Sequence, residues 1–483
     1  MIITATSCNK WLDLKPEDGI IRQNYWNTKE QLNAAVTGCY SSLLNNNLIT
    51  QLFRWGEMRA DMIGLTIRAS IDDVNIKDNN LLSSNSITRW AEVYQTINYC
   101  NTVIEFAPSV KEKDNTLTEL QLNAYLAEAH GLRGLMYFYL LRSFGEVPLQ
   151  LKATSSDATL DQLEKSSQTD VYNQILEDLK FAEQNAVLSY NNNNTNKGRI
   201  TKYSVYAMLA DVYLWNDDYA NAITYSDKII NSNLYSLYMA DNTQSFFTTV
   251  FRDGNSQESI FELQFDLQKQ SPAFNLFAAT ARPYTITNKA LDYFGLDDVD
   301  PSNVDFRGDG NSFRSSDQSI AKHAGIYDGS TFNLVTSTTS TANWFLYRYS
   351  DILLLKAEAL AWSNRGQEAL DIIAAIRTRA HALSSTIEAP AADNPEGISE
   401  YILRERSREF AFEGKRWYDM LRISKRNNYR QIDLMIAIVA ESAPADRQQS
   451  IINKYRDSRS HYLPINEYEL QADRNLVQNP FYK

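Results

Sequence analysis

The sequence contains few of the residues that build metal and redox centres. Its 483 residues include 3 cysteines and 4 histidines. Three cysteines cannot all pair, and neither they nor the histidines show the spacing of a metal-binding motif. Cys39 and Cys100 fall inside apolar helical patterns, which predicts buried thiols. We therefore expect no cofactor, and no metal site built from His130, His323, His381 and His461.

Long apolar runs and an excess of positive charge are also absent. No stretch approaches the roughly 18 apolar residues that cross a bilayer. Lysine and arginine total 47 against 59 for aspartate and glutamate, so the net charge is -12. Nucleic acids and anionic membrane surfaces attract basic proteins, so neither is expected as the main partner. Hydrophobic residues still make up 43% of the chain, and its length favours several subregions or one extended helical array.

Catalytic signatures are missing as well. The sequence has no phosphate-binding glycine loop, Rossmann fingerprint, metalloprotease helix or nucleophile elbow. Glu409 and Glu413 could be imagined as the paired carboxylates of a glycosidase. They are expected to be neighbours on one helix surrounded by arginines, which favours an ion-paired scaffold instead.

A cluster of aspartates leaves three alternatives open. The cluster lies between residues 297 and 309 and could hold calcium, but it does not match the ligand spacing of an EF-hand loop. A solvated acidic loop is the preferred interpretation, and the others are a calcium site and a hydrolase that uses these carboxylates. The members are Asp297, Asp298, Asp300, Asp305 and Asp309.

What the sequence has in abundance is amphipathic helix. Between residues 122 and 149, apolar side chains recur at three- and four-residue spacing, which predicts a buried helix of about six turns. Gly131 and Gly134 weaken this helix, so we expect them to let another helix come close. The helix should end at Gly145, with Pro148 just beyond it.

Further helices follow the same pattern along the chain. A polar stretch at 64–86 is expected to be a loop, and the asparagine run at 191–194 a solvated linker. From residue 462 onward we expect an extended tail. The helices are expected at residues 27–44, 88–106, 169–186, 202–232 with a hinge at 215–218, 351–362, 367–382 and 398–422.

An internal repeat indicates how these helices are arranged. Residues 209–223 align without a gap on residues 356–370, which sets Asp211 on Glu358 and Trp215 on Trp362. Small residues at the crossing and an aromatic residue before the turn are typical of tetratricopeptide-type helix hairpins. The repeats are unevenly spaced, which predicts a scaffold of scattered hairpins.

The segment between the repeats has a different character. Residues 261–267 alternate strictly between apolar and polar, which predicts a strand with one buried face. Long polar stretches surround it, and such an insert in a helical chain favours a functional surface. We therefore predict a mostly α fold, a tetratricopeptide-like scaffold of helical hairpins with an inserted loop-rich region that contains short strands. Residues 9–483 should form a single domain, with the scaffold at about 27–232 and 345–425, the insert at about 233–344 and the tail at 462–483.

Several short motifs occur in a characteristic order. They are Cys8 with Trp11-Leu12-Asp13, GEMRAD at 56–61, the stretch at 128–148, RYSDILLLKAE at 348–358, ERSREF at 405–410 with EGKR at 413–416, and LPI at 463–465 with QNP at 478–480. In this order they resemble the SusD/RagB family of outer-membrane nutrient-binding lipoproteins. One departure is Phe481, which replaces the glycine usual before the final tyrosine.

The resemblance implies a superhelical scaffold of tetratricopeptide-like hairpins and binding without catalysis. It implies that the protein captures an oligosaccharide or other nutrient at the cell surface and delivers it to a SusC-like TonB-dependent transporter in the outer membrane. Residues 1–8 would then be the end of a secretory signal with a lipoprotein box, although they lack its basic region and full apolar region. Acylation of Cys8 would anchor the protein to the outer membrane. The alternative from local sequence alone is that Cys8 is an exposed thiol.

The binding residues are inferred from sugar chemistry, because this family has no ligand-binding motif. In the relatives, contacts come largely from the loop after the motif at 56–61 and from the region after the strand at 261. Aromatic faces stack on sugar rings, and charged or amide groups hydrogen-bond to hydroxyls. The competing hypothesis, from the hairpins alone, is an intracellular tetratricopeptide scaffold that binds peptides. The ligand-binding candidates are Arg68, Asp72 and Asp73 on one side, and Phe274, Phe277 and Tyr284 on the other.

Overall fold

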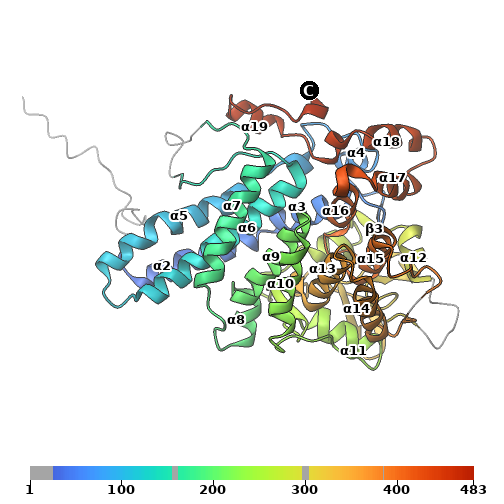
Figure 1. Cartoon of the computed structure of the whole chain (residues 1–483), viewed down its shortest axis with the longest axis horizontal. Coiled ribbons are helices and arrows are strands. Elements are labelled where there is room, and N and C mark those ends of the chain that lie inside the picture. The colour runs from blue at the N-terminus through green and yellow to red at the C-terminus, as the bar shows by residue number, and fades with distance from the viewer. Residues whose placement is uncertain (1–24, 155–161, 296–303, 385) are drawn as a thin grey trace, which may run out of the picture.

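A computed structural model describes residues 25–154, 162–295, 304–384 and 386–483. Within these ranges the chain is mostly helical, and its strands form two-stranded sheets. Figure 1 shows the long N-terminal helices at one end of the molecule, and the insert with the C-terminal helices at the other. The predicted fold class, helical with a loop-rich insert of short strands, is confirmed.

Four pairs of helices build the scaffold. They are α2 (Lys29–Leu43) with α5 (Ala91–Lys113), α6 (Glu119–Phe144) with α7 (Gln168–Asn185), α9 (Lys202–Trp215) with α10 (Tyr219–Ile230), and α13 (Tyr349–Ala361) with α14 (Gly366–Arg379). The pairs pack in chain order, because α5 contacts α6, α7 contacts α9 and α10 contacts α13. The last two pairs coincide with the two copies of the internal repeat, so the hairpins that the repeat predicted are confirmed.

The helix α6 lies at the centre of the scaffold, as its apolar pattern predicted. Thr118 caps its first turn, and Gly145, with a φ of 74°, ends it. A Cβ atom on Gly134 would lie 3.3 Å from Leu179 of α7, which confirms the expected close approach of a helix. A Cβ on Gly131 would lie 3.3 Å from Ile200, so this glycine faces the segment before α9 rather than a helix.

Two antiparallel strand pairs attach the insert to the scaffold. β1 (Ile63–Leu65) pairs with β3 (Tyr284–Ile286), and β2 (Ser259–Leu263) pairs with β8 (Trp344–Arg348), which leads directly into α13. The other elements of the insert are α11 (Thr243–Phe247), the π-helices η4 (Thr248–Arg252) and η5 (Phe274–Ala278), α12 (Asn288–Gly295), β4 (Phe313–Arg314), η6 (Ser315–Asp317), β5 (Ser319–Ile320), β6 (Gly325–Asp328) and β7 (Thr331–Leu334).

The strand predicted at 261–267 is shorter and deeper than expected. It begins at Ser259 and ends at Leu263, and all five residues are buried, so the expectation of one exposed face is wrong. The polar residue in its interior is Glu262. Its carboxylate accepts hydrogen bonds from the Asn343 amide at 2.7 Å and from the Asn255 backbone N–H at 3.0 Å. These bonds satisfy the charged group that periodicity had placed on a solvent face.

The helix predicted at 398–422 is two helices. α15 (Pro395–Glu409) and α16 (Arg416–Tyr429) are separated by a turn in which Phe412 and Gly414 have φ values of 64° and 77°. A right-handed helix cannot continue through positive φ. The apolar periodicity resumes after the turn, which is why the sequence suggested one continuous helix.

Two stretches predicted to be irregular contain short helices. Ser70 caps α4 (Ile71–Lys77) within the polar stretch 64–86, and Asn192 caps α8 (Asn193–Gly198) within the asparagine run. Serine and asparagine are strong N-caps because their side chains bond to the free backbone N–H groups of the first turn. The sequence signal for both helices was therefore the cap rather than an apolar stripe.

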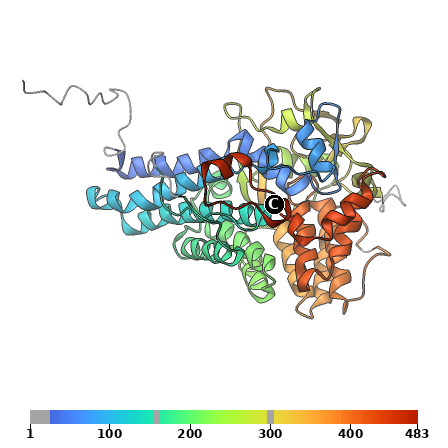
Figure 2. The ribbon, with the colours of Figure 1, turned by 90° about the horizontal axis from the view of Figure 1, so that it is seen from above.

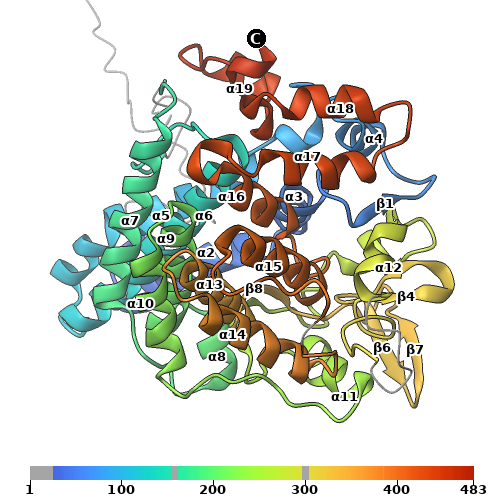
Figure 3. The same ribbon diagram turned by 45° about the vertical axis from the view of Figure 1, so that its right-hand side comes forward.

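The segment after the scaffold also contains helices that the sequence did not suggest. Two of them, α17 (Ile432–Glu441) and α18 (Gln448–Tyr455), lie beside α4 in Figure 3, and Lys454 of α18 donates to the Asn79 carbonyl at 2.6 Å. The tail, expected to be extended, includes one helix and a final helical turn. The other elements of this segment are η7 (Ser458–His461), α19 (Glu467–Ala472) and η8 (Pro480–Tyr482). Two further elements that were not predicted, α3 (Asn46–Glu57) and η2 (Ser86–Thr88), lie between α2 and α5.

One apolar cluster connects the scaffold, the insert and the tail. It runs from Trp26 to Ile465 and includes side chains of β2, β3 and β8. Figure 2 shows the insert and the C-terminal helices side by side at the same end of the molecule. Cys39 and Cys100 are buried in this cluster as free thiols, as predicted. Among the described helices, none is both long and apolar enough to cross a bilayer.

Candidate ligand-binding site

The two stretches predicted to contact ligand lie side by side. The β1–β3 ladder pairs Leu65 with Tyr284, and the backbone N–H of Thr66 donates to the Pro283 carbonyl at 2.9 Å. The π-helix η5 contacts β3 on the same side of the insert. The fold therefore brings the two halves of the predicted site together, although they are far apart in the sequence.

Three candidate residues are buried in the contact between these stretches. Asp73 accepts hydrogen bonds from the Arg54 guanidinium at 2.8 Å and from the Tyr284 hydroxyl at 3.1 Å. Burial raises the pKa of Tyr284, so its hydroxyl keeps the proton that it donates. Phe277 packs edge-on against Phe53, with ring centroids 5.2 Å apart. In this structure Asp73, Phe277 and Tyr284 are therefore buried contacts that join the two stretches beneath the exposed surface.

The other three candidates reach the surface. Arg68 is exposed and follows Ile67, whose exposed fraction is 97%. Asp72 is half-buried, and its carboxylate accepts from the Ser86 backbone N–H at 2.9 Å. Phe274 is half-buried at the start of η5. An exposed cation beside apolar side chains suits a ligand with both hydroxyl groups and apolar ring faces. Ligand contact by these residues stays a prediction.

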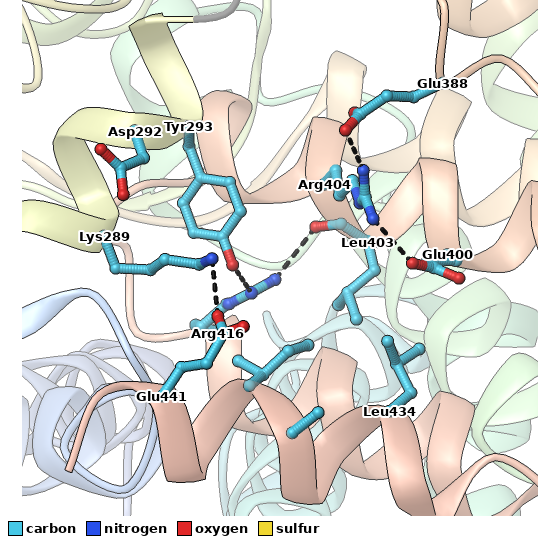
Figure 4. Close-up of a pocket in the computed structure, with 12 residues that line it drawn as sticks. Lys289, Asp292, Tyr293, Glu388, Glu400, Leu403, Arg404, Arg416, Leu434 and Glu441 are labelled. Atoms are coloured by element: carbon cyan, nitrogen blue, oxygen red, sulfur yellow. Dashed lines mark hydrogen bonds and ion pairs between the residues drawn. The ribbon is translucent and has the colours of Figure 1, made fainter. Parts of the chain in front are cut away.

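A cleft opens next to this surface, between α12, which directly follows β3, and the helices α15 and α17 (Figure 4). Its volume is about 430 Å³, within the range of small-molecule sites. Leu403, Leu434 and Ile438 form an apolar wall. The cleft could not be predicted from the sequence, because one of its walls is α17 and no helix was predicted there.

Charged side chains surround the mouth of the cleft. Lys289 pairs with Glu441 at 2.7 Å, and Arg404 lies between Glu388 and Glu400, with 2.8 Å to Glu400 (Figure 4). All five side chains are partly exposed, so water screens these pairs and each group can exchange partners at little cost. The cleft thus offers an apolar wall for a ring face and a rim of donors and acceptors for hydroxyl groups.

A buried ion pair closes the floor of the cleft. Arg416 donates to both carboxylate oxygens of Asp61 at 2.9 and 3.0 Å, and the Tyr293 hydroxyl donates to Asp61 at 2.6 Å. Burial alone would raise the pKa of Asp61, but the Arg416 guanidinium outweighs it and holds that pKa below its usual value. Because Asp61 precedes β1, this pair connects the cleft to the first predicted ligand loop.

The glutamates considered as a catalytic pair are structural. Arg379 contacts Glu409 at 2.5 Å, and Arg348 and Lys322 contact Glu413 at 2.9 and 3.0 Å, all fully buried. Burial would raise the pKa of Glu413, but these cations hold it at about 2. A general acid needs a raised pKa and must face the substrate. The predicted ion pairing of both glutamates is confirmed. The prediction that they are neighbours on one helix is wrong, because Glu409 ends α15 and Glu413 lies in the turn that follows.

The aspartate cluster is described only in part. Asp297, Asp298 and Asp300 lie outside the described residues. Asp305 pairs with Arg307 at 2.7 Å. The carboxylate of Asp309 accepts from the Ser315 hydroxyl at 2.6 Å. In the part of the chain that the structure describes, no three side chains of His, Cys, Asp or Glu gather in a way that could hold a metal ion.

Two family models match the chain. The SusD family model matches residues 166–482, which is well over half of the sequence. A second model, described as starch-binding and associating with the outer membrane, matches residues 10–214. The two matches overlap and together reach almost from one end of the chain to the other.

Curated relatives and solved structures agree with these matches. SusD-like protein P38 of Formosa agariphila is 27% identical over 471 residues, covering 87% of this chain and 88% of the relative. A SusD-like protein of Bacteroides ovatus is 23% identical over 467 residues, covering 87% of this chain and 80% of the relative. A SusD superfamily structure from Bacteroides vulgatus superposes with a TM-score of 0.76 at 22% identity, covering 95% of this chain and 100% of that one. The structure of B. fragilis NanU superposes with a TM-score of 0.72 at 23% identity, covering 97% of this chain and 100% of that one. At these identities the solved structures show the shared fold.

Proposed function

Because the chain belongs to the SusD family, we propose that it binds an oligosaccharide at the cell surface and passes it to a SusC-like TonB-dependent transporter. Family membership implies glycan binding in polysaccharide utilisation, in association with the outer membrane. SusD family proteins are non-catalytic binding proteins. The nature of the glycan, the transporter and the anchoring are the parts that we propose.

The observation that carries the proposed site is the meeting of two distant loops beside a cleft. Arg68 and Phe274 reach the surface from the two sides of the β1–β3 ladder, and the cleft lined by Tyr293 lies next to it. This surface combines exposed apolar groups with cations and carboxylates, which is the chemistry that a saccharide requires. Glu409 and Glu413, the two glutamates considered as a catalytic pair, are buried and ion-paired, which supports binding without cleavage.

Calorimetry against a panel of neutral and acidic polysaccharides tests the binding. We expect saturable binding to at least one glycan, weakened about tenfold by Arg68→Ala or Phe274→Ala. Arg474→Ala is the matched control, because Arg474 is also exposed but lies in the tail. No reducing ends should appear during incubation. Binding that both loop variants leave unchanged would contradict this placement, and steady release of reducing ends would contradict the non-catalytic function.

Delivery and anchoring need separate tests. We propose that acylation of Cys8, which lies outside the described residues, holds the protein on the outer membrane. More than one acyl chain makes such attachment stable, since each buried methylene adds about 0.8 kcal/mol. In the native organism, Cys8→Ser should move the protein from the membrane to the soluble fraction. The wild-type protein should co-purify with a TonB-dependent transporter, and its recovery without one would contradict the proposed partner.

A further inference from the structure

A second groove lies away from the loops of the proposed site, against the C-terminal tail. It forms where the end of α6, the start of α7 and the end of α16 meet the C-terminal tail, and its volume is about 430 Å³. Its lining includes Gln168, Lys425, Tyr429 and Tyr462. Phe144, Glu146, Asn479 and Pro480 of its lining belong to the family motifs at 128–148 and 478–480, whereas Lys425, Tyr429 and Tyr462 lie outside those motifs and outside the proposed loop site.

The groove contains a cation without a carboxylate partner. Within the described residues, Lys425 forms no ion pair, and its Nζ lies 4.8 Å from the centroid of the Trp215 ring. The nearby carboxylates are already engaged, since Arg426 contacts Asp217 at 2.9 Å and Glu358 at 2.7 Å. Burial lowers the pKa of Lys425 to about 8. The Asp217 carboxylate opposes this lowering, but it is paired with Arg426 and forms no ion pair with the amine, so a ligand carboxylate would be the first direct counter-ion of Lys425.

The other charged groups at the groove have partners. Glu146 pairs with Lys165 at 3.0 Å, and Arg459 pairs with Asp457 at 2.6 Å. These pairs leave Lys425 as the uncompensated charge among the described lining residues. The groove is therefore locally positive on a protein whose net charge is -12.

A second unpaired cation lies behind the groove. Arg59 is 2% exposed, donates to the His461 carbonyl at 2.6 Å and lies 4.0 Å over the Trp417 ring. Its Nε and Nη2 atoms are buried without a hydrogen-bond partner, and no carboxylate within the described chain pairs with it. Because His461 directly precedes Tyr462, this guanidinium adds positive potential behind the wall of the groove.

The backbone at the groove is strained. Asn427, Asn428 and Tyr429 have successive φ values of 49°, 58° and 63°. Asparagine tolerates this left-handed region, but tyrosine does not adopt it readily, and such outliers gather at functional sites. The turn places Tyr429 in the lining beside Tyr462, and the ring of Tyr429 packs on His461 with centroids 5.3 Å apart. The strained turn therefore presents an aromatic wall next to the unpaired lysine.

We propose that this groove binds the carboxylate-bearing unit of an acidic saccharide, with Lys425 as counter-ion and Tyr429 and Tyr462 as walls for the ring. A carboxylate supplies the charge that Lys425 lacks, whereas a neutral sugar leaves the amine unpaired. Gln168, whose amide oxygen accepts from the Tyr462 hydroxyl at 3.3 Å, lies within the same lining for contact with hydroxyl groups. This inference deepens the proposed function and rests on it, because it names the class of glycan.

The test compares acidic oligosaccharides with their carboxyl-reduced forms, in which a neutral hydroxymethyl group replaces each carboxylate on the same sugar backbone. The probes are oligosaccharides of polygalacturonate, alginate and hyaluronan, titrated into the full chain by calorimetry. At least one acidic form should bind about thirtyfold more tightly than its reduced form, and Lys425→Met should remove that difference. Lys202→Met, at the start of α9, is the matched control and should leave binding unchanged. Lys425→Arg should restore part of the affinity.

The outcomes separate this inference from the proposed function. Since Lys425 is unpaired, Lys425→Met should not lower the melting temperature, so a loss of binding will not reflect unfolding. Binding of neutral glycans alone would overturn the inference and leave the proposed function standing. Acidic binding that Lys425→Met leaves unchanged would also overturn it. Binding of a polyglutamate peptide in place of every saccharide would identify a protein-docking groove instead. Failure to bind any glycan would contradict the proposed function and this inference together.

Discussion

Buried carboxylates in this protein differ in charge because their partners differ. Glu409 and Glu413 are surrounded by cations, which keep both ionised. Glu57 is equally buried but accepts only from the backbone N–H groups of Gly414 and Lys415, at 3.0 and 3.3 Å, and its second oxygen has no hydrogen-bond partner. Burial raises the pKa of Glu57 to about 8. At the residue scale, stability therefore depends on the neighbours of a group as much as on its depth.

The raised pKa of Glu57 predicts a pH dependence of stability. A folded-state pKa above the unfolded value contributes stability that is present below about pH 4.5 and is lost as the pH rises through about 8. Glu57→Gln removes this titration. The free energy of unfolding of the variant should therefore fall less between pH 5 and 8 than that of the wild type. The difference between the two falls should be a few kcal/mol at most, about 1 kcal/mol per pKa unit. Urea unfolding at several pH values measures the difference.

The control for this prediction is Glu112→Gln, because Glu112 is exposed on α5. The buried histidines do not interfere with the comparison. Burial lowers the pKa of His323 and of His461 to about 4. The stability that these neutral histidines contribute to the fold is therefore lost as the pH falls from about 6.5 towards 4. This loss is common to wild type and variants. Equal slopes for wild type and Glu57→Gln would show that Glu57 does not titrate in this range.

At the scale of elements, close backbone contacts determine where helices meet. Gly56 in α3 faces the turn between α15 and α16, and a Cβ atom there would lie 1.8 Å from the carbonyl oxygen of Gly414. The neighbour is backbone, so no side-chain rotation can relieve the clash. This contact holds the break between the two C-terminal helices against the N-terminal part of the chain.

Gly56→Ala should therefore destabilise the protein strongly, by about 3 kcal/mol or more. Gly38→Ala in α2 should have the opposite effect on stability, because nothing lies within 4 Å of a Cβ at that position. Alanine should stabilise α2 there by about 1 kcal/mol. Chemical denaturation of the two variants beside the wild type tests both signs at once. A small effect of Gly56→Ala would mean that the α15–α16 turn moves easily.

At the scale of the whole molecule, the insert and the scaffold share one core. The apolar cluster extends from Trp26 to Ile465, and the β2–β8 pair connects the insert to the start of α13. The insert cannot unfold without exposing scaffold side chains. The regions of the chain should therefore behave as one cooperative unit.

We expect a single thermal transition for residues 9–483. The midpoints from far-ultraviolet circular dichroism and from tryptophan fluorescence should coincide within about 2 °C, as two-state unfolding requires. Calorimetry should show one peak. An early fluorescence transition with helix content retained would indicate that the insert unfolds separately and would contradict the single-domain prediction.

The sequence by itself determined the helices, because helical periodicity is local. The stripe of α6, the hinge between α9 and α10 and the two copies of the repeat are where the amino-acid pattern placed them. Their spacing follows from the turn of the helix, which any apolar face must obey. The ion-paired character of the segment around Glu409 was also readable, because charges of opposite sign alternate there.

Tertiary structure alone decided the partners and the sites. The break after α15 depends on Gly414 meeting Gly56, and the cleft depends on α12, α15 and α17 coming together around it. The burial of Phe277 and Tyr284 likewise follows from the β1–β3 pairing rather than from their own composition. Lys425 shows no sign in the sequence that it lacks a counter-ion. Such contacts join residues far apart in the chain, and local periodicity carries no information about them.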